Sequence, residues 1–137
     1  MINLDYQAAR FGLEMVTDVT DTDDCKNLEN LVNQALGILC EQSPFAMMLW
    51  GETKFKANSR KMGNALWCSA IRLLQEAKLL TSDFPLPNRP NRRPNLKRLN
   101  DDLCSDFTKL AVARELLERM LVYARYYAKS TTPETCI

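Results

Sequence analysis

The sequence predicts an all-α fold: a single-domain bundle of four or five helices with a long Pro/Arg-rich loop before the last helix. Apolar residues recur at spacings of three and four along most of the chain, which is the period of an amphipathic helix. The chain has only four glycines, which is few for a β-rich fold, and no segment alternates like a strand between hairpin turns. A length of 137 residues suits one domain, spanning 1–137, that buries its own core.

The first two helices are predicted over residues 4–19 and from an Asp cap to about Glu41. The first has an apolar face formed by Leu4, Ala8, Phe11, Met15 and Val19, widened by Leu13 and Val16. Asp23 or Asp24 supplies a cap for the second. Its inner face consists of Leu28, Leu31, Val32, Ala35, Leu36 and Leu39.

Ser43 and Pro44 predict the start of a short third helix, because Ser is a good N-cap and Pro fits the first helical position. Gly51 and the polar residues after it weaken that helix. Asn58 or Ser59 caps a fourth helix that runs to about Leu80. Its inner face contains Met62, Leu66, Ala70, Leu73 and Ala77, and its outer face contains Lys61, Arg72, Gln75 and Glu76.

Residues 81–99 contain four of the six prolines and are predicted to form an extended basic loop. A long last helix follows, from Asn100 or Asp101 to about Lys129. Its apolar positions are Leu103, Phe107, Leu110, Leu117, Leu121, Ala124 and Ala128.

Charge is sorted along the chain. Residues 1–50 contain two Lys or Arg and eight Asp or Glu, whereas residues 51–100 contain eleven Lys or Arg and three Asp or Glu. Residues 101–137 are close to neutral, so the formal total is only +1. A block this basic indicates a local surface for a polyanion, because clustered cations repel one another until a partner offsets them.

The candidate nucleic-acid-binding residues form two groups and one link between them. The loop group is Arg89, Arg92, Arg93, Lys97 and Arg98; the helix-junction group is Lys54, Lys56, Arg60 and Lys61; Arg72 lies between them in sequence. Guanidinium groups make forked hydrogen bonds to phosphate, and each neutralised phosphate releases counterions. The alternative for the loop is a solvated linker whose charge aids solubility.

Aromatic residues near these cations are interpreted differently. Trp50 continues an apolar run and is expected in the core, although a base-stacking role is the alternative. Tyr123, Tyr126 and Tyr127 are expected to contact the core or another subunit rather than bases. No helix exposes Arg, Asn or Gln along one face like a recognition helix, so backbone binding is favoured over base reading.

The composition argues against an enzyme. The chain has no histidine, which removes the commonest general base and most catalytic zinc ligands. The five cysteines are scattered without a CxxC pair, as suits a reducing cytosol, and four of them are expected to be core residues or surface thiols. The acidic run at residues 21–24 lacks the Gly and the terminal Glu of a calcium loop. We therefore expect no cofactor, no metal and no membrane span, in a soluble cytoplasmic protein.

Two segments resemble a known family. The opening YQAARFGLEMV and the closing FTKLAVARELLERMLVYARYYAKS are similar to the small subunit of CRISPR effector complexes, in Cascade-like and type III assemblies. The resemblance implies a helical bundle that lines the interior of the complex and stacks on further copies of itself. It also implies basic residues that contact the guide–target duplex or the displaced DNA strand.

The resulting hypothesis is a non-catalytic small subunit of a CRISPR ribonucleoprotein in antiviral defence. Its expected partners are guide RNA or target DNA backbone, other effector-complex subunits and further copies of itself. One alternative is a helical protein-interaction adaptor whose basic surface meets an acidic protein partner. A second is an enzyme that uses carboxylates alone, which requires a pocket of converging Asp or Glu side chains.

Overall fold

The computed structural model describes residues 3–17, 25–54, 60–81, 84, 97–104 and 106–135. These ranges contain five long α-helices and one short π-helical segment, and no strand, which confirms the predicted all-α fold. The elements are α1 (Leu4–Thr17), α2 (Cys25–Glu41), α3 (Pro44–Lys54), α4 (Arg60–Glu76), the π-helix η2 (Asn100–Cys104) and α6 (Phe107–Thr135).

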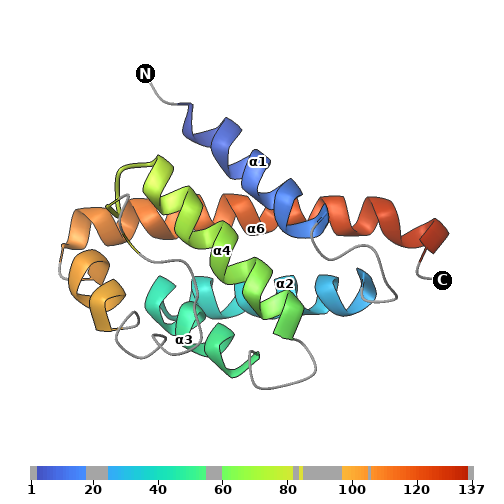
Figure 1. Cartoon of the computed structure of the whole chain (residues 1–137), viewed down its shortest axis with the longest axis horizontal. Helices are drawn as coiled ribbons and strands as arrows, with labels where there is room; N and C mark the ends of the chain where they lie inside the picture. The colour runs from blue at the N-terminus through green and yellow to red at the C-terminus, as the bar shows by residue number, and fades with distance from the viewer. Residues whose placement is uncertain are drawn as a thin grey trace.

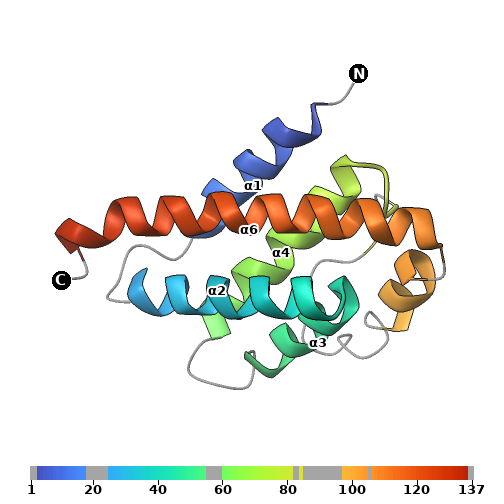
Figure 2. The same ribbon diagram turned by 180° about the vertical axis from the view of Figure 1, so that it is seen from behind.

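The long helix α6 organises the bundle. In Figure 2, α2 and α6 run side by side and antiparallel. On their other side α1 and α4 cross this pair obliquely, as Figure 1 shows. Helix α6 makes its most extensive contacts with α1 and α2, while α1 also packs on α4 and α3 joins α2 to α4. The chain thus forms two helical layers around a shared interior.

Helices α1 and α3 each begin at a side-chain cap that accepts a hydrogen bond from a backbone N–H group. The Oδ1 atom of Asn3 accepts a hydrogen bond from the Tyr6 N–H at 3.0 Å, which starts α1. The Oγ atom of Ser43 accepts one from the Ala46 N–H at 3.1 Å, which confirms the predicted cap of α3. Helix α3 then continues through Gly51 and ends at Lys54.

The last helix begins later than predicted. Its cap is Asp106, whose Oδ1 accepts from the N–H groups of Thr108 at 2.9 Å and Lys109 at 3.3 Å. The prediction of a start at Asn100 or Asp101 was wrong, because residues 97–104 form a separate helical segment. For the same reason residues 97–99 are a helical turn rather than part of an extended loop. Of the rest of that predicted loop, residues 82–83 and 85–96 lie outside the described ranges.

Helix α4 ends at Glu76, four residues before the predicted end at Leu80. The Lys78 N–H donates to the Gln75 carbonyl at 3.0 Å, and the Leu79 N–H donates to the Leu74 carbonyl at 2.9 Å. This pair of bonds is a Schellman motif, which needs one residue in the left-handed region. Lys78 occupies that position with φ 65°.

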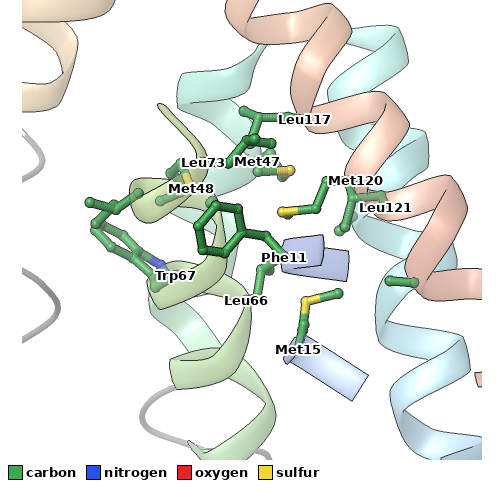
Figure 3. Packing of buried hydrophobic residues seen from close by; sticks show 14 of the residues in the cluster. Phe11, Met15, Met47, Met48, Leu66, Trp67, Leu73, Leu117, Met120 and Leu121 are labelled. Carbon is green, nitrogen blue, oxygen red and sulfur yellow. The ribbon is translucent and has the colours of Figure 1, made fainter. Parts of the chain in front are cut away.

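The core draws on all five helices. Figure 3 shows Phe11 and Met15 of α1 between α4 and α6, close to Leu66 and Met120. Helix α4 is buried on most sides, because residues 65–67, 69–71 and 73–74 are all buried. Leu66, Ala70 and Leu73 of the predicted inner face are thus buried as expected, Ala77 is partly buried beyond the end of α4, and the buried surface of α4 is wider than predicted; the Met62 side chain lies outside the described part.

Two residues predicted on inner faces are exposed instead. Leu13 is 42% exposed because α1 approaches α6 through Gly12, which turns Leu13 outward. A Cβ on Gly12 would lie only 2.7 Å from the Met120 carbonyl oxygen. Phe107 is 84% exposed in the first turn of α6, and the buried residues of that helix begin only at Ala113.

The carboxyl end of α2 is capped by a side chain from α6. The Nη2 atom of Arg114 donates a hydrogen bond to the carbonyl of Cys40. The last carbonyls of a helix lack partners within the helix, and a cation there also offsets the negative end of the helix dipole. Arg114 thus joins the two antiparallel helices at one end of their contact.

Candidate nucleic-acid interface

The structure describes the side chains of three of the ten predicted binding residues: Arg72, Lys97 and Arg98. Lys54, Arg60 and Lys61 belong to α3 and α4, but their side chains are outside the described part. Lys56, Arg89, Arg92 and Arg93 lie wholly outside it. Their predicted roles therefore stay predictions.

Arg72 is exposed, as predicted, whereas most of residues 65–76 of α4 are buried. It lies three residues before Gln75, so the two side chains are neighbours on the helix surface. The Nε2 atom of Gln75 donates to the carbonyls of Thr81 at 3.2 Å and Phe84 at 3.0 Å. Arg72 therefore lies on the side of α4 that holds the start of the Pro/Arg-rich segment.

Arg98 lies at the other end of the Pro/Arg-rich segment in the sequence and contacts the same two residues that Gln75 holds, Thr81 and Phe84. Its Nη2 donates to Thr81 Oγ1 at 3.1 Å, and its guanidinium lies over the Phe84 ring, 5.0 Å from the centroid. Its Nε is 3.4 Å from Asp102 Oδ2. We call Gln75, Thr81, Phe84, Arg98 and Asp102 the anchor. It brings α4 and the 97–104 segment together, and Lys97 is exposed beside it.

A second charged region lies where α1 meets α6. It contains an open hollow of about 400 Å³, which is lined by Asp5, Glu115, Glu118, Arg119, Val122 and Tyr123. The Tyr123 hydroxyl donates to the Asp5 carboxylate at 3.0 Å, and Arg119 lies 3.6 Å from the same carboxylate. The hydrogen bond to Asp5 raises the pKa of Tyr123, with burial and the Asp5 charge adding to it.

The sequence did not reveal the pairing of Asp5 with Tyr123. The expectation for Tyr123 and Tyr127 was a core or subunit contact, and both pack partly buried against the core. Tyr126 is 64% exposed. Trp50 packs partly buried against the core, as expected. No local pattern could have identified Asp5, because its partner lies 118 residues away.

Cys40 is not an activated thiol. Partial desolvation raises its pKa, and the charge of Glu118 and the hydrogen bond that the thiol donates to that carboxylate raise it further, against the opposing charge of Arg114. Nucleophilic cysteines need the opposite shift. Cys40 therefore stays protonated at neutral pH.

The described side chains contain no group of three Cys, Asp or Glu residues that could hold a metal ion. Among the described helices, none has the length and apolar character needed to cross a membrane.

Comparison with known proteins found no relative of this chain. No family model, no curated protein and no solved structure matches this chain.

Proposed function

We propose that the protein binds the phosphate backbone of a nucleic acid without reading its sequence, as a non-catalytic helical subunit of a CRISPR ribonucleoprotein effector complex. One observation carries the backbone-binding part. Arg72 is exposed on α4 one helical turn before Gln75, which holds Thr81 and Phe84, and Lys97 is exposed next to Arg98, which contacts the same two residues. Exposed cations next to one shared set of contacts support a surface for a phosphate backbone. The CRISPR setting rests on the sequence resemblance alone.

The hollow beside α1 gives the proposal a second surface. Three carboxylates, from Asp5, Glu115 and Glu118, line it against one guanidinium. Opposite charge on different surfaces favours head-to-tail stacking of copies, with the basic surface of one copy toward the acidic surface of the next. Self-association in this manner belongs to the proposed assembly role.

Catalysis is not part of the proposal. The chain has no histidine, and the raised pKa of Cys40 disfavours its thiolate. The hollow at α1 has carboxylates, but those of Glu115 and Asp5 are already paired with Arg119, at 2.9 Å and 3.6 Å.

The test is binding of the full chain to single- and double-stranded oligonucleotides of unrelated sequences across a range of KCl concentrations. We expect similar affinities for different sequences, and a linear fall of log K with log salt whose slope reports the number of phosphates neutralised. Absence of binding at low salt would reject the proposal. If the protein instead bound a polyglutamate peptide but no oligonucleotide, the adaptor with an acidic protein partner would be favoured.

A further inference from the structure

Arg98 differs from its neighbouring cations in how it is held. Its guanidinium contacts three groups at once: the Thr81 hydroxyl, the Asp102 carboxylate and the Phe84 ring. A planar guanidinium suits this combination, because its edge donates in a fixed fork while its face stacks on an aromatic ring. Its side chain is only 38% exposed.

The groups that Arg98 joins are themselves fixed to the core. Phe84 is 2% exposed and Leu99 is fully buried, so each flank of residues 85–96 carries a buried apolar side chain. Gln75 of α4 satisfies the carbonyls of Thr81 and Phe84. The two flanks therefore stand at defined positions, and Arg98 is the side chain that spans from one to the other.

Lys97, the cation before Arg98 in the sequence, has a more exposed side chain. It precedes Arg98 on the same helical turn and is exposed, so its charge faces solvent. A phosphate approaching Arg98 meets a guanidinium whose donors already serve Thr81 and Asp102, and the Asp102 carboxylate repels it. Two adjacent cations of the proposed interface are thus placed for different tasks.

We propose that Arg98 is a positioning residue: it joins Thr81 and Phe84 to the 97–104 segment and acts on a nucleic acid only through the exposed Lys97 beside it. This inference rests on the proposed backbone binding. Its physical basis is entropic, because a segment that is already held in place leaves less conformational freedom to be lost when its exposed cation meets a phosphate.

The test compares salt-dependent oligonucleotide binding of the full chain with the variants Arg98→Ala, Arg98→Lys and Lys97→Ala. Loss of a phosphate contact lowers the slope of log K against log salt by about 0.7–0.9. Lys97→Ala is expected to show that loss. Arg98→Ala is expected to lower the affinity roughly three- to tenfold at every salt concentration with an unchanged slope. Arg98→Lys keeps the charge but loses the fork and the stacking, so it should resemble Arg98→Ala.

Asp102→Asn gives the sharpest contrast, because it keeps every cation and removes one negative charge. A positioning role predicts weaker binding, since the variant loosens Arg98. A direct phosphate contact by Arg98 predicts tighter binding. Thr81→Val removes a single hydrogen bond and supplies a milder variant, and circular dichroism melting of each variant verifies that it is folded.

These binding measurements distinguish the positioning role of Arg98 from the proposed backbone binding. A reduced slope for Arg98→Ala, or tighter binding by Asp102→Asn, overturns the positioning role while leaving backbone binding intact. A wild-type protein that binds no oligonucleotide at low salt overturns the proposed function, and the positioning role with it.

Discussion

Two glycines within helices have very different surroundings. The Cβ position of Gly12 is closed by the backbone of α6, with the Met120 carbonyl oxygen at 2.7 Å and the Ala124 nitrogen at 3.1 Å. The Cβ position of Gly37, in α2, has no atom within 4 Å. The same substitution should therefore have opposite effects at these two residues.

Gly12→Ala is expected to destabilise the fold by about 1–3 kcal/mol, because the added methyl group forces α1 away from α6. Gly37→Ala should stabilise it by about 0.5–1 kcal/mol, because alanine has less freedom to lose when a helix forms. Urea denaturation of both variants checks this. A Gly12→Ala variant as stable as the wild type would contradict the close packing of α1 on α6.

Lys78 adopts a left-handed conformation that suits glycine. Lys78→Gly should stabilise the protein by roughly 1 kcal/mol, since a residue with a Cβ is strained there. Lys78→Ala is the matched control, because it removes the charge and keeps the Cβ. Thermal melting should show a gain for glycine alone, and an equal gain for alanine would assign the effect to charge.

The Cys40 thiol should react slowly with iodoacetamide near neutral pH, because its pKa is raised from 9.0. Glu118→Gln removes one cause of that shift, so labelling of Cys40 at pH 8 should become faster. Peptide mass spectrometry measures this rate separately from the other cysteines. Glu115→Gln, one turn earlier on α6, is the control and should leave the Cys40 rate unchanged; equal acceleration in both would remove Glu118 as the cause.

At the scale of elements, the contact of α1 with α6 contains a pH-sensitive hydrogen bond from Tyr123 to Asp5. The pKa of Tyr123 is raised in the folded state, so this bond stabilises the fold fully below the unfolded value of about 10. That stability is lost as pH rises through the folded pKa, when the phenol ionises.

Tyr123→Phe should therefore lower the melting temperature at pH 8, and the difference from the wild type should shrink as pH rises above 10. Thermal melts between pH 8 and 11 measure the difference. Tyr126→Phe, at an exposed neighbouring tyrosine, should show no such trend. A Tyr123→Phe difference that stays constant across this range would contradict a role for the ionising hydroxyl.

The helices that the sequence located well have caps that act within one turn. Ser43 caps α3 through a residue three positions on, and the apolar faces of α1 and α2 follow the helical period. The start of α6 failed because several residues before it can cap a helix equally well. Residues 100 and 101 belong instead to the preceding helical segment, which Arg98 joins to Thr81, 17 residues away, and Asp106 caps α6.

At the scale of the whole molecule, the sequence identified the basic block but not how its members are held. Exposure of Arg72 followed from the helical period of α4. The contacts of Arg98 did not, because Thr81 lies 17 residues away and meets it only through the fold. The acidic hollow was missed for the same reason, since its side chains come from opposite ends of the chain.

Charge is sorted along the sequence, and we propose that the basic residues of its middle part bind phosphates. The most direct measurement is the salt slope of oligonucleotide binding for two double variants that remove equal charge. We predict that Arg92→Ala with Arg93→Ala lowers the slope by about 1.4–1.8, whereas Lys109→Ala with Lys129→Ala on α6 leaves it unchanged. Equal slopes for the two double variants, or no binding by the wild type at low salt, would contradict the account.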